Sequence, residues 1–408
     1  MPKCAEGADA VSSLHTRDVL VAGVGMLPFV KPSATQAYPL LGAGAAKAAL
    51  ADAGIDYAQV DQAFVGFVYG DSCSGQAALY QVGLSGIPIV NVNNNCATGS
   101  TALYLARQAV ASGAAECVLA LGFEQMQPGA LGVHFKDRPD PSQRLLDTMA
   151  EVQGCDAQAP VAAQLFGGAG RLHARLYGTR PETFARIAVK ARRHAANNPL
   201  AVFRQPLTVD EVLASPTVFD PLTRLQCCPP TCGGAAAVLC SPEFARRSGL
   251  RPAVRILAQA MTTDRNSSFD ERDMRRLVGF DMTRRAARAV YEAAGIGPED
   301  IPVVELHDCF TANELLSYEA LGLVAEGEAE AFVCSDANTY GGRVVTNPSG
   351  GLLSKGHPLG ATGLAQCAEL VWQLRGSAGA RQVQDAALAL QHNLGLGGAC
   401  VVTLYGRA

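Results

Sequence analysis

The 408-residue sequence is poor in charged and aromatic side chains, which make up 17% and 6% of it, and it has a single tryptophan. No apolar run reaches the ~18 residues of a membrane-spanning helix, so we expect no integral membrane segment. The net charge of −4 at pH 7 provides no basic field that would attract nucleic acid or an anionic membrane. Residues 1–17 contain acidic side chains and no apolar block, so we expect neither a secretory signal nor a transit peptide there.

The 13 cysteines are odd in number and follow no repeating spacing. Such scatter is typical of free thiols in a reducing compartment rather than of a disulfide framework. Cys227, Cys228 and Cys232 form the only cluster, and their spacing lacks the paired ligands of a zinc site. We therefore expect buried structural thiols there and no metal in the protein.

Two stretches of the sequence correspond to one another. An alanine-rich segment that leads to Ala53-Gly54-Ile55 is matched by a second one that leads to Ala294-Gly295-Ile296, and each is typical of a helix that ends at a glycine. Ala97-Thr98-Gly99 and Ala361-Thr362-Gly363 then precede further helical segments in the same order. Because strand-like runs follow each helix, the pattern predicts an α/β fold of layered helices and strands in two similar halves.

The division of the chain follows from this repeat. We expect an N-terminal half over residues 1–270 and a C-terminal half over residues 271–408. Residues 125–220 are richer in proline and polar side chains, and the helices there are expected to be irregular. This span is interpreted as a loop domain inserted into the first half.

Cys96 lies between an apolar strand-like run that ends at Val90 and an amphipathic helical segment over 101–111. The helix dipole and the free N–H groups of a helix N-terminus favour a thiolate, which is the form that acts as a nucleophile. A small side chain buried at a tight turn would give the same local sequence. The two interpretations stay open at this level.

Two histidines are candidates for the partners of Cys96. His357 precedes the equivalent helix of the second half, where a neutral imidazole could accept the proton of Cys96, although it could also be a capping residue. His307 and Cys309 follow a strand-like run and alternate, so on an extended backbone both would point to one face. They could equally be core residues. The glycines around Gly395 could bring backbone N–H groups to a substrate oxygen, or form an ordinary turn.

Taken together, these segments resemble the thiolase superfamily, and most of all its sterol carrier protein x type. The resemblance rests on the asparagines that precede Cys96, the His-Asp-Cys-Phe segment at 307–310, the Asn-Pro-Ser-Gly-Gly segment at 347–351 and the Gly-His-Pro-Leu-Gly-Ala-Thr-Gly segment at 356–363. It spans almost the whole chain. The printed sequence ends at Ala408 without a lipid-transfer segment, so the resemblance does not extend to sterol carriage.

The resemblance implies a five-layered αβαβα thiolase fold in which an inserted loop domain covers coenzyme A. It also implies a homodimer or a dimer of dimers, with acyl-CoA and coenzyme A as substrates and no resident cofactor. The implied reaction is reversible cleavage of a 3-ketoacyl-CoA to acetyl-CoA or propionyl-CoA and a shortened acyl-CoA. A decarboxylating ketoacyl synthase and a non-catalytic lipid-binding partner are the alternatives.

The same resemblance assigns roles to individual residues. Cys96 is the nucleophile, His357 activates it, and His307 completes an oxyanion hole with His357. The backbone N–H groups of Cys96 and Gly395 form a second oxyanion hole. Many thiolases carry an acid/base cysteine in a Cys-x-Gly triplet, but the matching triplet here begins with Asn393. Cys309 is therefore the candidate for that proton transfer.

Three further expectations concern the substrate, the backbone and the location. Arg192 and Arg193 belong to a basic segment and are candidates to bind the phosphates of coenzyme A, although a solvated helix face would read the same. Gly233 stands where relatives often have an aspartate, a change that the sequence does not explain. The family suggests a peroxisome or mitochondrion in a eukaryote and the cytoplasm in a bacterium, and the chain does not end in a Ser-Lys-Leu type address.

Overall fold

The computed structural model describes residues 17–127 and 135–408, and ten of the twelve strands in these ranges form two groups of five. The first group comprises β1 (Leu20–Met26), β2 (Gln62–Gly66), β3 (Ile89–Val92), β4 (Cys117–Glu124) and β7 (Gly233–Cys240). The second comprises β8 (Val254–Thr262), β9 (Val303–Glu305), β10 (Val345–Thr346), β11 (Leu388–Gly395) and β12 (Ala399–Arg407).

The two groups have the same topology. The first runs in the order β3-β2-β4-β7-β1 and the second in the order β10-β9-β11-β12-β8. In each group the second strand pairs in parallel with its two neighbours, and the fourth strand is antiparallel to both of its own. A single pairing of Leu20 with Arg255 joins the groups at β1 and β8. The predicted fold of two similar halves is confirmed.

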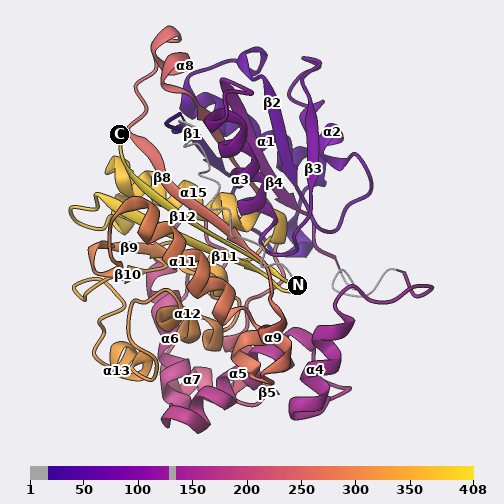
Figure 1. Ribbon diagram of the computed structural model, residues 1–408, viewed down its shortest axis with the longest axis vertical. Helices are drawn as coiled ribbons and strands as arrows, with labels where there is room; N and C mark the ends of the chain where they lie inside the picture. The colour runs from indigo at the N-terminus through magenta and orange to yellow at the C-terminus, as the bar shows by residue number, and fades with distance from the viewer. Residues whose placement is uncertain (1–16, 128–134) are drawn as a thin grey trace, which may run out of the picture.

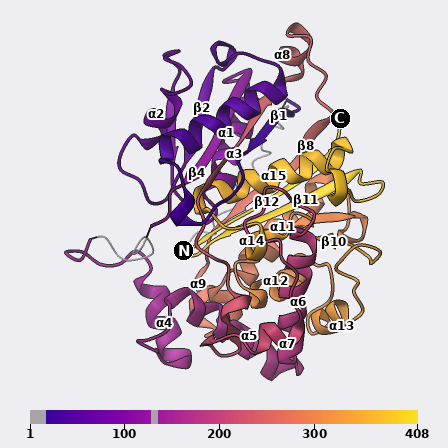
Figure 2. The same ribbon diagram turned by 180° about the vertical axis from the view of Figure 1, so that it is seen from behind.

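The helices complete five layers (Figures 1 and 2). They are α1 (Tyr38–Ala53) and α2 (Ser74–Leu79) on one outer face, α3 (Thr98–Ala111) and α15 (Leu359–Arg375) in the centre, and α11 (Phe280–Ala294) and α12 (Thr311–Ala320) on the other face. Both central helices contact strands of both groups, and they contact each other. The two halves therefore meet in the central layer. Buried apolar side chains line this layer.

Local sequence accounts for the ends of the repeated helices. Both α1 and α11 end at a glycine in the left-handed conformation, Gly54 with φ 71° and Gly295 with φ 66°, as predicted. The helix α3 begins at Thr98, within the expected segment. The helix α15 begins at Leu359, two residues before the expected Ala361, because Pro358 supplies a fixed φ at its N-cap.

The predicted insertion lies in the connection between β4 and β7, which runs over 125–232, whereas the equivalent connection between β11 and β12 is only 396–398. It contains α4 (Gln143–Gln153), α5 (Val161–Tyr177), α6 (Pro181–Ala195), α7 (Val209–Leu213), β5 (Thr217–Phe219) and β6 (Leu222–Thr223). The expectation of irregular helices was wrong, since α5 and α6 are regular over 17 and 15 residues. Their buried apolar faces outweigh the polar composition.

The inserted helices pack against the second half rather than the first. Figure 1 shows α4 to α7 gathered beside α9 (Asn266–Asp270), α12 and α13 (Ala329–Cys334), and α5 and α6 both contact α12. Lys190 of α6 is buried and donates to Glu314 of α12, which ties the insertion to the strand group that carries His307. The division at residue 270 stays a prediction, although β8, which begins at Val254, already belongs to the second strand group.

No helix in the ranges 17–127 and 135–408 is both long enough and apolar enough to cross a membrane.

Candidate functional site

Two of the candidate catalytic residues, Cys96 and His307, lie between a strand and a helix, and the third, His357, lies between the helices α14 (Gly351–Ser354) and α15. Cys96 lies between β3 and α3, after Asn95, whose φ of 50° turns the chain sharply. His357 lies just before α15. A β-carbon on Gly99 would come within 2.7 Å of the carbonyl oxygen of Gly360, so the absence of a side chain lets the starts of α3 and α15 approach closely. This close approach brings the two turns together.

The structure brings Cys96, His307 and His357 into one cluster. The sulfur of Cys96 and one ring nitrogen of each histidine all lie within 4.8 Å of one another. The two imidazole rings meet edge to face, with centroids 5.2 Å apart and an interplanar angle of 84°. Cys96 is partly exposed whereas both histidines are buried. The cluster therefore lies just below the surface, with both imidazoles shielded from bulk water.

Burial opposes the effect of the helix N-terminus on Cys96. Burial, reinforced by Glu124, raises the pKa of the Cys96 thiol to about 12, against a smaller opposing effect of backbone N–H groups at Leu396 and Cys96. The free protein therefore favours the thiol of Cys96 over its thiolate. Cys96 needs a base that takes its proton during attack.

His357 has the contacts of such a base. Its Nδ1 lies 2.7 Å from the hydroxyl of Thr362, and its backbone N–H donates to Thr231 at 2.6 Å. Its Nε2 is buried and has no hydrogen-bond partner within the described parts of the chain. Burial, followed by the charge of Lys355, lowers the pKa of His357 to about 3, so the ring is neutral at pH 7. A neutral imidazole with a free nitrogen is available to accept a proton.

Polar neighbours contact both the ring and the backbone of His307. Its Nδ1 lies 3.0 Å from Nδ2 of Asn393, its carbonyl oxygen accepts from Asn313 at 2.5 Å, and its backbone N–H donates to Nδ1 of His392 at 3.5 Å. Burial, with smaller contributions from His357 and His392, places the pKa of His307 well below its usual value. His307 is therefore a neutral hydrogen-bonding group rather than a cation.

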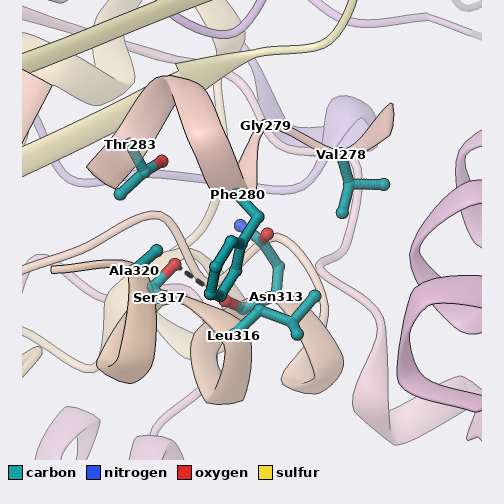
Figure 3. A pocket seen from close by; sticks show the side chains of 8 residues that line it. All are labelled: Val278, Gly279, Phe280, Thr283, Asn313, Leu316, Ser317 and Ala320. Atoms are coloured by element: carbon teal, nitrogen blue, oxygen red, sulfur yellow. Dashed lines mark hydrogen bonds between the residues drawn. The ribbon is translucent and has the colours of Figure 1, made fainter. Parts of the chain in front are cut away.

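A small cavity lies between the first turn of α11 and α12 (Figure 3). It is lined by Thr283 and Phe280 of α11 and by Asn313 and Ser317 of α12, among others. Its volume of about 10 Å³ is close to the lower limit for one water molecule. Thr283 also binds Nε2 of His392 at 2.9 Å, so the residues around the cavity brace the histidine segment and leave no room for a substrate.

Cys309 is buried next to two other thiols. Burial, followed by the nearby Cys228 and Cys96, raises the pKa of Cys309 well above its usual value. The backbone N–H of Cys228 donates to the carbonyl of Cys309 at 2.9 Å, and Cys227 pairs with Phe310 in an antiparallel bridge. Cys309 therefore rests as a neutral thiol close enough to Cys96 to interact with it electrostatically. Two members of the cysteine cluster expected to be structural, Cys227 and Cys228, therefore lie beside the segment that carries Cys309.

Gly395 lies against the turn that carries Cys96. A β-carbon at Gly395 would come within 2.3 Å of the carbonyl oxygen of Asn94 and 3.1 Å of the backbone nitrogen of Ala97. A glycine is required for this approach, which places the backbone of β11 beside the nucleophile. The contribution of the Gly395 N–H to an oxyanion hole stays a prediction.

Arg192 and Arg193 do not join the catalytic cluster. Arg192 stacks over the ring of Phe203 at 4.7 Å and is half-buried, and burial lowers the pKa of its guanidinium. Arg193 is exposed and donates to Thr339 at 3.1 Å. Both lie at the C-terminal end of α6, and their role in binding coenzyme A stays a prediction.

The structure accounts for the unusual glycine at 233. A β-carbon there would come within 2.3 Å of the ring of Phe29, which fills the space beside the start of β7. Any side chain at position 233 would displace that ring, so the position of Phe29 requires a glycine here.

Residues 19–243 match the family described as "Thiolase, N-terminal domain", and residues 263–405 match "Thiolase C-terminal domain-like". This chain belongs to the thiolase family. The two matches cover the first strand group and, apart from β8, the strands of the second, and they agree with the resemblance drawn from the motifs.

Several curated proteins and solved structures are similar to this thiolase. Sterol carrier protein 2 of Homo sapiens is 58% identical over 393 residues, which cover 95% of this chain and 72% of the relative. An acetyl-CoA acetyltransferase of Methanothermobacter thermautotrophicus is 37% identical and covers 96% of this chain and 100% of the relative.

Among solved structures, the Ltp2-ChsH2(DUF35) aldolase aligns with a TM-score of 0.82 at 27% identity, covering 97% of this chain and 99% of the other. Human mitochondrial 3-ketoacyl-CoA thiolase aligns with a TM-score of 0.72 at 19% identity, covering 96% and 99%. The second similarity supports the fold alone.

Proposed function

We propose that this thiolase acts through an acyl-Cys96 intermediate, with His357 as the base for Cys96, His307 as an oxyanion donor and Cys309 as the acid/base thiol. The chain is an acyltransferase that cleaves or forms 3-ketoacyl-CoA. The observation that carries the residue assignment is the unpartnered Nε2 of His357 in a cluster with the Cys96 sulfur. A neutral thiol and a neutral imidazole in this arrangement can exchange a proton as a bond forms.

In the cleavage direction, the sulfur of Cys96 attacks the 3-keto carbon while its proton passes to His357. The thiolate and the imidazolium formed together stabilise each other, so the transfer accompanies attack rather than preceding it. The C2–C3 bond then breaks and leaves an acyl group on Cys96 and the enolate of acetyl-CoA. Hydrogen bonds from His307 and from the protonated His357 stabilise the enolate oxygen.

The high pKa of Cys309 suits both of its proposed steps. As a neutral thiol it has a proton to give to the enolate carbon, which yields acetyl-CoA. The thiolate that remains is a strong base and takes the proton from incoming coenzyme A. The coenzyme A sulfur then attacks the acyl-Cys96 thioester, and Cys96 leaves as the restored thiol once His357 returns its proton. Synthesis reverses these steps.

His392 is not available as an alternative proton carrier. Its Nδ1 accepts from the backbone N–H of His307, and its Nε2 is bound to the hydroxyl of Thr283. Burial lowers the pKa of His392 to about 3, so it stays neutral. Both nitrogens of His392 are therefore engaged in contacts with His307 and Thr283. Cys309 is left as the titratable group that can protonate the enolate.

The deciding experiment is a coenzyme A-dependent cleavage assay with a length series of 3-ketoacyl-CoA substrates. We expect acetyl-CoA and a shortened acyl-CoA as products, with a requirement for free coenzyme A. A decarboxylating synthase would release carbon dioxide, and an aldolase would cleave without consuming coenzyme A. A catalytically inert protein would give no product, so each alternative has its own outcome.

Coenzyme A is proposed to meet cations at the end of α6. Reversing the charge of Arg192 and Arg193 to glutamate should raise KM for coenzyme A by at least about tenfold and leave kcat little changed, because one charge-assisted contact to phosphate contributes about 1.5 kcal/mol, which corresponds to about a tenfold change in affinity. The same reversal at Arg246 and Arg247 on α8 (Pro242–Arg247) is the matched control. A KM that does not change and does not respond to salt would count against the proposal.

A homodimer is proposed to form at the open edge of β3. This strand lies at the end of its group, and the apolar side chains near it are exposed: Leu84 at 79%, Tyr80 at 55% and Val90 at 40%. An unpaired apolar edge favours association with another strand. Leu84→Glu should shift the mass measured by light scattering from dimer to monomer, whereas Leu176→Glu on α5 should not. A monomeric wild type would refute it.

The reaction as proposed needs coenzyme A only as a substrate and uses no resident cofactor. Location in a peroxisome or mitochondrion of a eukaryote, or in the cytoplasm of a bacterium, rests on the family resemblance. Imaging of the untagged protein in its own cell with an antibody is the measurement that decides it.

A further inference from the structure

A chain of buried polar side chains crosses the boundary between the two halves and ends at His307. Its members are fully buried, and they are Tyr405 of β12, Gln391 and Asn393 of β11, Ser100 of α3 and His307 itself. None of the motifs assigns a role to the first four. The contacts of these side chains give a direction to each hydrogen bond, starting from a backbone carbonyl that contacts Gln391.

The direction is set at Gly363. The amide group of Gln391 lies 2.7 Å from the carbonyl oxygen of Gly363, and a carbonyl oxygen can only accept. The atom that faces it is therefore the Nε2 donor, and Oε1 faces the hydroxyl of Tyr405, which donates to it. The second hydrogen of Nε2 points to Oγ of Ser100 at 2.8 Å.

The next two links depend on how the amide of Asn393 is oriented. Its Oδ1 lies 2.8 Å from Oγ of Ser100, and because an amide oxygen can only accept, the Ser100 hydroxyl donates to it while a lone pair accepts from Gln391. The other end of the Asn393 amide is then the NH₂ group. Its Nδ2 lies 3.0 Å from Nδ1 of His307, so Nδ1 of His307 must accept.

We propose that Asn393 is a positioning residue that fixes His307 as the tautomer with its proton on Nε2. Asn393 occupies the position where many thiolases carry their acid/base cysteine. Here the amide points the N–H of His307, rather than a lone pair, into the site. The inference rests on the oxyanion role proposed for His307, since an N–H donor is what a developing oxyanion requires.

His357 is held in the opposite tautomer by a different contact. The hydroxyl of Thr362 donates to the carbonyl of Pro358 at 2.9 Å, so it accepts from Nδ1 of His357. The Nε2 of His357 therefore presents a lone pair. Of the two facing imidazoles, His307 is therefore a hydrogen-bond donor and His357 is a base. An N–H at His307 also suits an oxyanion better than a metal ion, which would need a lone pair from each ligand.

Nitrogen-15 NMR of the histidine rings tests the assignment without any need for activity. The His307 signals are identified by their loss in His307→Asn. In the wild type we expect a protonated Nε2 and an unprotonated Nδ1 with no titration between pH 6 and 9, in keeping with the depressed pKa. A proton on Nδ1 in the wild type would overturn the proposal, whatever the outcome of the activity assays.

Asn393→Asp tests whether Asn393 determines the tautomer of His307. A carboxylate offers no hydrogen to Nδ1, so a proton should move to Nδ1 of His307 in this variant, and an unchanged nitrogen pattern would refute the role of Asn393. We expect kcat for thiolysis to fall by about 10²-fold, the scale of one lost oxyanion donor, with KM for coenzyme A within about threefold.

Two controls separate positioning from damage to the fold. Asn198→Asp makes the same substitution at another buried amide, which donates to Ser349 at 2.9 Å, and it should lower the melting temperature without lowering kcat. In the His307→Asn background, Asn393→Asp should lower the residual rate by less than about threefold, because there is no tautomer left to fix. An equal loss in both backgrounds would mean that Asn393 is merely structural.

Discussion

Replacement of Cys96 by alanine is expected to abolish both cleavage and synthesis, with a loss of at least about 10⁴-fold in kcat, as is typical of a lost nucleophile. No acyl-enzyme can form without the sulfur. The fold should persist, because Cys96 is partly exposed and lies in a turn fixed by its neighbours. In the wild type, mass spectrometry after mixing with acetyl-CoA should place the acetyl group on Cys96.

Acylation of another cysteine would contradict this assignment. Cys228 and Cys309 are the informative alternatives, since both thiols interact with Cys96 electrostatically. Tryptic peptides that carry residue 96 and residues 228 and 309 separate these outcomes. A Cys96→Ala protein that still forms an acyl-enzyme would contradict the proposed mechanism.

The pH dependence of Cys96 alkylation provides an independent check on the same residue. Because the pKa of Cys96 is raised to about 12, the thiolate fraction grows tenfold for each pH unit below that value. Alkylation by iodoacetamide should therefore accelerate steadily from pH 7 to 10 without a plateau. A plateau near neutral pH would instead reveal a resting thiolate–imidazolium pair with His357. The exposed Cys73 and Cys155 serve as internal references.

The duplicated fold could be predicted because its signals are local. Alanine-rich helices that end at Gly54 and Gly295 recur at the same place in each half, and each depends on a few consecutive residues. The candidate residues Cys96, His307 and His357 lie in turns that carry distinctive motifs, and the structure brings them together. A turn that precedes the equivalent helix in both halves is enough to predict that the two turns meet.

The tautomers and protonation states of those residues could not be predicted in the same way. The tautomer of His307 depends on Ser100, which is separated from Asn393 by 293 positions in the chain. The sequence identifies Asn393 as the residue in place of a thiol, but not what its amide contacts. The resting protonation state of Cys96 could not be predicted either, for a related reason. The favourable helix start is visible locally, whereas the burial and the carboxylate of Glu124 that oppose it arise only from tertiary packing.

Cys309→Ser is expected to lose thiolysis by at least about 10²-fold, the lower end of what a general acid or base contributes. It should also lose the exchange of the acetyl-CoA methyl protons with deuterated solvent. Both reactions require a group that moves a proton at the acetyl carbon. A serine hydroxyl is too weak an acid for this step, and Asn393 has no titratable proton near neutral pH. Cys96 should still react with iodoacetamide, because its surroundings are unchanged.

The matched control is Cys228→Ser, which changes the same atom in a neighbouring buried thiol. Cys228 lies opposite Cys309 across a backbone hydrogen bond of 2.9 Å, and burial raises the pKa of both thiols. If Cys309 transfers the proton, Cys228→Ser keeps the exchange and Cys309→Ser loses it. The reverse result would assign the role to Cys228. Near wild-type exchange in both variants would mean that neither thiol acts on the enolate, and since both nitrogens of His392 are already bound, the proton would then have to pass through His357.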